Sequence, residues 1–446
     1  MLRNAGALTA NEIGTRLRIS QPTVSRLLAT GGTRIARIGR ARATRYALAR
    51  EVGREGGRWP LYRIDDRGRA HRSGELTALH GERFLLDPAT ATPSPHANAF
   101  ADGLYPGLPW FLDDQRPQGF LGRAFARRVA ADIGAPADLG TWHGDDVLLA
   151  LLRHGDDLLG DYVLGEAALQ RAQRAITAPT GVIDAARRKA QYPTLAEATL
   201  RGEAVGSSAG GEQPKFAVTL RDGDGLRPVI VKFSPRGDSA AAKRWADLLR
   251  AEHIAASVLR AHGVAAAPSD LVIADGRVFL ESTRFDRTPC LGRRGFASLA
   301  AVDAAFHGNG RLDWWRYADT LQRDRWLDAD NAHRMRLLSW FGTLIGNTDM
   351  HLGNAGLLLA DARPPALAPA YDMLPMAFRP TAGGEVLARE PVIVPPPPEC
   401  RADWMQAAAM ARAFWRRVAG HRAINADFVA IARQALAALD AAAGRA

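Results

Sequence analysis

The chain has 446 residues, of which 47% are hydrophobic and 24% charged, so it is expected to form roughly two to four globular domains. Its two cysteines, Cys290 and Cys400, exclude a disulfide framework and a four-cysteine zinc site. No apolar run approaches the roughly 18 to 20 residues of a membrane span, and residues 1–6 lack the apolar core of a signal peptide. A cytoplasmic protein without membrane association is therefore predicted.

The formal net charge of +11 is concentrated near the N-terminus. Residues 1–50 contain ten arginines and a single acidic residue, Glu12, whereas the rest of the chain is nearly neutral. A basic segment of this kind is typical of contact with nucleic acid.

Residues 7–30 predict two short helices joined by a tight turn. Thr9 and Glu12 have the spacing of a capping box that begins the first helix. Ser20 is placed to cap the second helix, and Pro22 lies in its first turn, where a missing N–H costs little. The predicted buried side of the second helix consists of Val24, Leu27 and Leu28.

Residues 35–46 alternate apolar and other side chains around a turn at Gly39, which predicts a β-hairpin. Two helices followed by such a hairpin indicate a winged helix-turn-helix DNA-binding domain over residues 1–52. The predicted DNA contacts are Gln21, Thr23, Ser25, Arg26, Arg40 and Arg42. The alternative is a small protein-docking domain whose charge is merely solvated.

The next part of the chain contains patterns of strands and helices but no candidate catalytic residue. After a linker at 53–58, short apolar segments between turn residues predict a small antiparallel β unit over 59–110. Residues 120–175 have the apolar spacing of helices, and an Ala-rich helical stretch is predicted over 402–442.

Residues 206–215, GSSAGGEQPK, precede an apolar strand at 216–220. Glycines let backbone N–H groups approach a phosphate closely, and Lys215 adds positive charge. The sequence is not a Walker A motif, and an ordinary hairpin loop is the alternative interpretation.

Lys232 interrupts an apolar strand at 228–233 and needs an anionic partner if it is buried. Glu252, on the helix predicted over 245–259, is within reach of it, as in the lysine–glutamate pair of protein kinases. These two residues alone are equally consistent with a structural salt bridge.

Residues 345–354, IGNTDMHLGN, contain the most specific pattern. Asp349 and Asn354 have the five-residue spacing of a kinase catalytic loop, in which the Asp orients the acceptor hydroxyl and the Asn holds magnesium. A predicted hairpin then leads to Asp372, placed to be a second magnesium ligand. A turn residue at Asp349 and a helix cap at His351 would explain each residue singly, but not the ordered set.

These residues resemble the HipA family of bacterial serine/threonine kinases, the toxins of type II toxin–antitoxin pairs. The resemblance covers residues 60 to 440, and its most specific segments are SSAGGEQPK, VIVKF, RFDR, GNTDMHLGN and AYDMLP. The N-terminal helix-turn-helix departs from the basic HipA layout and is similar to the YjjJ-like branch. The resemblance implies a two-lobed α+β kinase-like fold, with an N-lobe region over 111–285 and a mainly helical C-lobe over 286–446.

The resemblance also implies the roles of individual residues. Asp349 would be the catalytic base, Asn354 and Asp372 would hold Mg²⁺, and Lys232 would contact the phosphates of ATP. Ser208 aligns with a serine whose autophosphorylation disrupts the phosphate loop and silences the kinase. The remaining implied ATP contacts are Gly210, Gly211, Glu212, Gln213, Pro214, Lys215, Thr283, Arg284, Phe285, His351, Leu352, Gly353, Asn354, Tyr371 and Asp372. Pro214 differs from the family pattern.

The expected function is that of an ATP- and Mg²⁺-dependent serine/threonine protein kinase, a growth-inhibiting toxin fused to a DNA-binding domain. Family members typically phosphorylate aminoacyl-tRNA synthetases, so a translation-related protein is the expected substrate. DNA, an antitoxin and a second copy of the chain are the expected partners. The alternatives are a transcription regulator with a non-catalytic kinase-like sensor domain and a small-molecule kinase of the aminoglycoside type.

Overall fold

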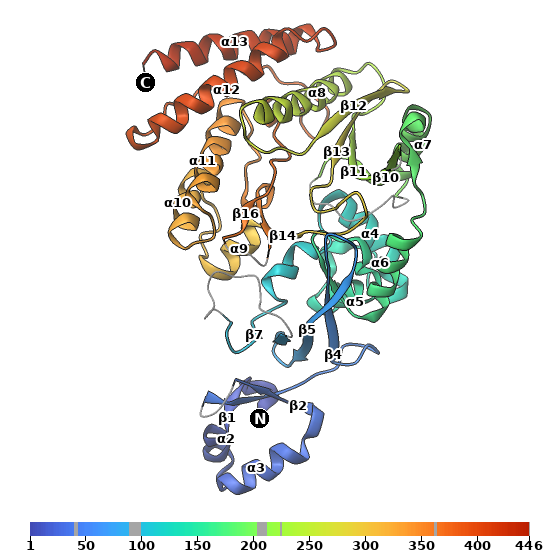
Figure 1. The fold of residues 1–446 in the computed structure, drawn as a ribbon, viewed down its shortest axis with the longest axis vertical. Helices are drawn as coiled ribbons and strands as arrows, with labels where there is room; N and C mark the ends of the chain where they lie inside the picture. The colour runs from blue at the N-terminus through green and yellow to red at the C-terminus, as the bar shows by residue number, and fades with distance from the viewer. Residues whose placement is uncertain (40–42, 89–99, 203–211, 224, 361–363, 446) are drawn as a thin grey trace.

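The computed structural model describes residues 1–39, 43–88, 100–202, 212–223, 225–360 and 364–445 (Figure 1). Four β-sheets and their flanking helices succeed one another along the chain. The N-terminal unit lies at one end of the molecule and the last two helices lie at the other (Figure 1). None of the helices in the described ranges is long and apolar enough to cross a membrane.

The N-terminal unit contains the two predicted helices and the predicted hairpin. Its elements are α1 (Leu2–Ala5), β1 (Leu8–Thr9), α2 (Ala10–Leu17), α3 (Gln21–Thr30), β2 (Ile35–Ile38) and β3 (Arg45–Leu48), with sheet order β1-β3-β2. The capping box is present, because Glu12 N donates to Thr9 Oγ1 and Thr9 N donates to Glu12 Oε2. Arg18, in the left-handed region with φ 54°, turns the chain between α2 and α3.

Two details of α3 differ from the prediction. Leu27 is 54% exposed, because the small core formed by Leu8, Ile13 and Val24 covers only the side of α3 that also carries Leu28. Ser20 begins the helix without a side-chain bond to its backbone, and its Oγ instead contacts Thr23 Oγ1 at 3.0 Å.

The next unit is a five-stranded antiparallel sheet, β7-β6-β5-β4-β8. Its strands are β4 (Arg58–Ile64), β5 (Ala70–Leu79), β6 (Arg83–Pro88), β7 (Leu104–Tyr105) and β8 (Tyr162–Leu164). β8 lies beyond the range predicted for this unit and pairs with β4 at its edge. Three helices accompany the sheet, α4 (Gly119–Ile133), α5 (Gly144–His154) and α6 (Glu166–Thr177). We refer to residues 58–177 as the middle unit.

A second five-stranded sheet has the order β12-β13-β11-β10-β9. Its strands are β9 (Ile183–Asp184), β10 (Lys215–Asp222), β11 (Gly225–Phe233), β12 (Ser269–Ala274) and β13 (Arg277–Thr283), and its helices are α7 (Arg188–Leu200) and α8 (Ala240–Ala261). Residues alternate between the two faces of a strand, so Phe279 packs with Tyr192 of α7 while Leu280 packs with Leu249 of α8. This sheet is the N-lobe.

The last part of the chain is mainly helical, and we refer to it as the C-lobe. Its elements are β14 (Gly295–Ser298), α9 (Leu299–Phe306), α10 (Trp314–Arg323), α11 (Ala329–Leu344), β15 (Gly356–Leu359), β16 (Ala366–Leu367), α12 (Arg401–Ala419) and α13 (Ala426–Ala443). The predicted helical stretch at 402–442 is divided into two helices, because α12 ends at Ala419, followed by Gly420, and α13 begins after Asn425. The two helices contact each other, so the turn buries both apolar faces, including Phe414 and Phe428.

Candidate active site

Lys232 of β11 lies between two carboxylates. Its Nζ donates to Oε1 of Glu252 on α8 at 2.6 Å and to Oδ1 of Asp372 at 2.6 Å. The lysine is only 5% exposed. Burial opposes its charge, but the attraction of Asp372 and Glu252 outweighs burial and raises the pKa of Lys232. The structure therefore brings together the lysine and glutamate predicted as a pair and adds Asp372 to them.

Lys215 contributes a second positive charge to the same place. It is the cross-strand partner of Lys232 in the β10–β11 ladder and is 3% exposed. Burial lowers the pKa of Lys215 to about 8, and repulsion by Lys232 adds to this while Asp372 opposes it. An anionic group bound here would favour the charged form of Lys215.

Asp372 is held in an uncommon backbone conformation. Its φ is 54°, in the left-handed region, where a non-glycine residue costs about 1 kcal/mol. Burial acts against its carboxylate charge, but Lys232 and Lys215 outweigh burial and lower the pKa of Asp372. The carboxylate therefore stays ionised beside the two lysines.

The loop that carries Asp349 is braced by amide side chains. Oδ1 of Asn347 accepts from Asp349 N at 3.0 Å, and its Nδ2 donates to Asp372 O at 3.2 Å. Nδ2 of Asn354 donates to Asp349 O at 2.8 Å. Asn347 was not predicted from the sequence, although asparagine side chains commonly accept from the backbone N–H two residues further on, as in an Asx-turn. Asn347 connects the Asp349 loop to the Asp372 segment.

Several oxygens in this region are free to bind a cation. Within the described residues, no donor contacts the carboxylate of Asp349, Oδ1 of Asn354 or Oδ2 of Asp372. Mg²⁺ takes oxygen ligands and is usually bound by one or two carboxylates together with water and substrate phosphates. The described ranges contain no group of three or more His, Cys, Asp or Glu side chains that would form an all-protein metal site. The donor set therefore fits Mg²⁺ bound together with a nucleotide.

Aromatic side chains lie next to Asp372. The rings of Phe285 and Tyr371 are 5.6 Å apart, and Tyr371 Oη donates to Gly353 O at 2.9 Å. Burial raises the pKa of Tyr371. Thr283, Arg284 and Phe285, the predicted ATP contacts at the end of β13, form the hinge segment. Two of its backbone N–H groups are already used, since Thr283 N donates to Pro268 O and Arg284 N donates to Pro228 O. Of these three predicted contacts, Phe285 is the one whose side chain lies beside Tyr371.

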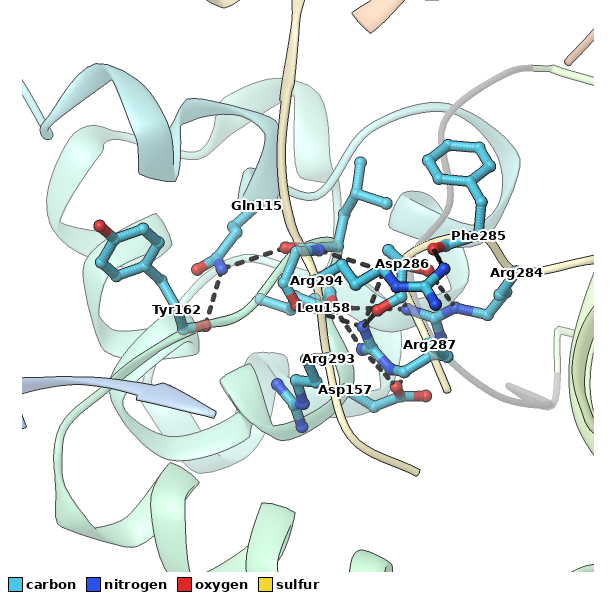
Figure 2. Close-up of polar contacts among 12 residues, drawn as sticks. Gln115, Asp157, Leu158, Tyr162, Arg284, Phe285, Asp286, Arg287, Arg293 and Arg294 are labelled. Atoms are coloured by element: carbon cyan, nitrogen blue, oxygen red, sulfur yellow. Dashed lines mark hydrogen bonds and ion pairs between the residues drawn. The ribbon is translucent and has the colours of Figure 1, made fainter. Parts of the chain in front are cut away.

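Three predicted nucleotide contacts have side chains that are committed elsewhere. Arg284 is buried against Asp286 and Asp157 (Figure 2). Leu352 belongs to the hydrophobic core, and Glu212 forms a two-point ion pair with Arg123 of α4 at 2.5 and 3.0 Å. Arg284 and Phe285 point to different sides of the turn that follows β13, since Arg284 contacts Asp286 and Asp157 while Phe285 lies beside Tyr371.

The remaining predicted residues are placed as follows. His351 is exposed and its Nδ1 accepts from Gly353 N, while Pro214 O accepts from Phe233 N. Nε2 of Gln213 is buried with no acceptor within the described ranges. Ser208, Gly210, Gly211, Arg40 and Arg42 lie outside the described residues.

The predicted DNA contacts on α3 lie mostly on its open side. Gln21, Ser25 and Arg26 are exposed, and Thr23 is half-buried against Ser20. The N-terminal unit thus presents polar and basic side chains from the second helix to solvent.

Comparisons with known proteins cover most of the chain. The family described as the YjjJ-like toxin, middle domain, matches residues 55–173, and the HipA-like C-terminal domain matches residues 207–442. The chain is 37% identical over 444 residues to toxin YjjJ of Escherichia coli K12, which covers 96% of this chain and 94% of that relative.

A solved structure shares the fold. HipA of Shewanella oneidensis MR-1, solved in a complex with HipB and operator DNA, superposes with a TM-score of 0.53 and 17% identity. The match covers 86% of this chain and 97% of that one. The predicted α+β fold of HipA type is therefore confirmed.

Proposed function

This chain belongs to the YjjJ-like toxins, with a HipA-like C-terminal domain, and from that premise we propose that it is an ATP- and Mg²⁺-dependent protein serine/threonine kinase. The observation that carries the proposal is the bridge from Lys232 to Glu252 and Asp372, beside the Asp349 loop. A buried lysine held by a helix glutamate and a second carboxylate is the arrangement that a kinase uses for nucleotide phosphates.

The proposal gives each residue of the site a task. Asp349 orients the hydroxyl of a serine or threonine and accepts its proton. Asn354 and Asp372 hold the cation, and Lys232 contacts the phosphates. When bound, ATP with Mg²⁺ supplies the phosphoryl group and neutralises its negative charge. Lys215 adds charge on the same side of the β10–β11 hairpin as Lys232.

The substrate and the autophosphorylation are also proposed. By family, the substrate is a translation-related protein such as an aminoacyl-tRNA synthetase, and its phosphorylation inhibits growth. Ser208 is the proposed site of autophosphorylation. Its segment is followed by Glu212, whose ion pair with Arg123 connects the end of the loop to the middle unit.

Residues 1–52 are proposed to bind DNA. The support is the excess of arginine in residues 1–50 and the exposed Gln21, Ser25 and Arg26 of α3. The HipA of similar fold was solved with its antitoxin and operator DNA, so an antitoxin partner is proposed as well.

The test of the kinase proposal is the substitution Asp349→Asn. Purified protein is incubated with and without ATP and Mg²⁺, and its intact mass is measured. The wild type is expected to gain phosphate, and the variant is expected to react at least about 100-fold more slowly because it lacks the proton acceptor.

Asp330→Asn is the matched control, because Asp330 is an exposed residue in the first turn of α11, which leads to the same loop. It should react like the wild type. Equal phosphate gain in Asp349→Asn and in the wild type would contradict the assigned base. A wild type that binds ATP, arrives unphosphorylated and never gains phosphate would favour the non-catalytic regulator.

A further inference from the structure

A cavity of about 510 Å³ lies away from the Lys232 site, between the middle unit and the N-lobe sheet. Residues of α4, α6, β10 and β11 contribute to its walls, together with the segment that follows β13. Among its lining residues, Ala175, Thr180 and Gly181 are exposed, whereas Arg287 and Arg293 are buried. The cavity therefore extends from exposed residues to buried guanidinium groups.

The positive charges of two arginines that line this cavity are balanced by carboxylates. Arg284 and Arg287 share the carboxylates of Asp286 and Asp157, with N–O distances of 2.7 to 3.0 Å (Figure 2). The carbonyl of Leu158 accepts a further bond from Arg287 at 2.6 Å. This network of two arginines and two aspartates has no net charge.

Arg293 is different, although it lines the same cavity and is only 5% exposed. Its Nη2 donates to the backbone carbonyl of Asp156, but Nε and Nη1 are buried and have no acceptor within the described residues. Figure 2 shows its guanidinium apart from the dashed network. Burial and repulsion by Arg287 lower the pKa of Arg293 to about 9. A buried cation with two unused donors is costly unless an anion accompanies it.

The charge of the whole lining leads to the same conclusion. The cavity wall and its supporting network together contain four guanidinium groups and three carboxylates. The guanidinium groups belong to Arg128, Arg284, Arg287 and Arg293, and the carboxylates belong to Asp156, Asp157 and Asp286. Burial raises the pKa of Asp156, which weakens its contribution of negative charge. His154 also lines the wall, and it is paired with Asp132.

The cavity also offers an apolar surface. Phe125, Leu158 and Ile176 line it, and the guanidinium of Arg128 lies over the ring of Phe125 at 5.4 Å. A volume of about 510 Å³ is in the range of small-molecule sites, which combine an apolar lining with a few polar groups.

We propose that this cavity binds a small organic anion, whose carboxylate or phosphate group lies against Arg293 and whose body lies against the apolar wall. The proposal does not rest on the kinase activity. The site shares the segment after β13 with the candidate active site, since Arg284 and Arg287 flank the pair formed by Phe285 and Asp286.

The test uses the full chain and two probes, phenyl phosphate and benzoate, measured by isothermal titration calorimetry. Saturating ADP is present, so that neither probe occupies the proposed nucleotide site. At least one probe should bind the wild type, and the probe that binds identifies the head group. Arg293→Met should weaken that binding by at least about tenfold, because the charge-assisted bonds are lost.

The variants separate a binding role from a structural one. Arg293→Met removes a buried cation with two unsatisfied donors and loses one hydrogen bond, so its thermal midpoint should stay close to that of the wild type. Ala175→Trp places a bulky side chain at an exposed lining residue, changes none of the arginines and should also abolish binding. Arg294→Met, an exposed arginine next in sequence that does not line the cavity, should bind like the wild type.

Two results would overturn the proposal: neither probe binds the wild type, or the bound probe keeps its affinity in Arg293→Met. If Arg293→Met is less stable than the wild type, its loss of binding is uninformative and Ala175→Trp decides. Retained binding in that second variant then rejects the cavity as the site.

Discussion

Two lysines and two carboxylates share one small volume at the centre of the candidate site. Lys232 makes direct bonds to both carboxylates, and burial opposes the charge of Lys215. The pKa values of the two lysines therefore move in opposite directions, that of Lys232 upward and that of Lys215 downward to about 8. Of the two, Lys215 is the group whose charge changes near neutral pH.

This difference predicts a pH dependence of nucleotide binding. Bound phosphate favours the charged form of Lys215. At a pH where Lys215 of the free protein is neutral, binding therefore takes up a proton at this lysine. The affinity for ADP should fall above pH of about 8, approaching about tenfold per pH unit. Isothermal titration calorimetry with ADP across this pH range measures the effect.

Lys215→Met should bind ADP more weakly at neutral pH and lose the pH dependence above 8. Lys243→Met, an exposed lysine on α8, should retain the wild-type profile. An identical profile in Lys215→Met would show that another group titrates.

The lowered pKa of Lys215 also affects the stability of the protein. The unfolded chain holds this proton up to a higher pH than the folded one, so the free energy of unfolding rises with pH above 8.

At the scale of elements, the segment after β13 joins the candidate site to the middle unit. Phe285 lies against Tyr371, while Arg284 and Asp286 face the middle unit and contact residues 157–160. Burial opposes the charge of Asp286, but Arg284 and Arg287 outweigh it and lower its pKa. The short segment after β13 thus contacts both the candidate site and the middle unit.

Asp286→Asn should destabilise the protein by about 3 to 5 kcal/mol, because it leaves two buried arginines with a single carboxylate. Urea unfolding followed by circular dichroism measures this change. Asp440→Asn removes an exposed partner of Arg412 and should cost less than about 1 kcal/mol. Equal effects of the two substitutions would mean that the buried network does not hold the units together.

Local patterns were predictable from the sequence, and contacts between distant segments were not. The capping box at Thr9 and the strand and helix of Lys232 and Glu252 depend on short-range spacing, and the structure contains them. The pairing of β8 with β4 joins residues about a hundred positions apart, so no local pattern indicated it. Leu27 has the spacing of a buried residue, but no neighbouring element covers it.

The same distinction applies to the site. Spacing predicted the loop of Asp349 and Asn354, but the bond from Asn347 to the Asp372 backbone depends on how two loops meet. The hydrogen bonds of the hinge N–H groups and the burial of Arg284 follow from packing against other units. The segment around Ser208 lies outside the described residues, so its predicted role stays a prediction.

At the scale of the whole molecule, the N-terminal unit is attached to the middle unit rather than tethered loosely. Arg50 N donates to Ala78 O at 3.0 Å, and the guanidinium of Arg50 makes two bonds of 2.7 Å to Asp145. Arg45 and Asp102 form a further ion pair. The unit lies at the end of the molecule away from α12 and α13 (Figure 1). A ligand of α3 would therefore approach the molecule far from those helices.

This arrangement predicts DNA binding that depends strongly on salt. If arginines of the N-terminal unit neutralise phosphates, counterion release makes the logarithm of affinity fall linearly with the logarithm of salt concentration, by about 0.9 per phosphate contacted. Arg26→Ala should reduce this slope by about one and weaken binding similarly for all sequences. Fluorescence anisotropy of a labelled duplex between about 50 and 200 mM salt measures the slope.

Arg416→Ala, at an exposed arginine near the opposite end of the molecule, is the control and should leave the slope unchanged. Equal slopes for Arg26→Ala and the wild type would remove α3 from the interface, and absence of binding at low salt would favour a protein-docking role for this unit.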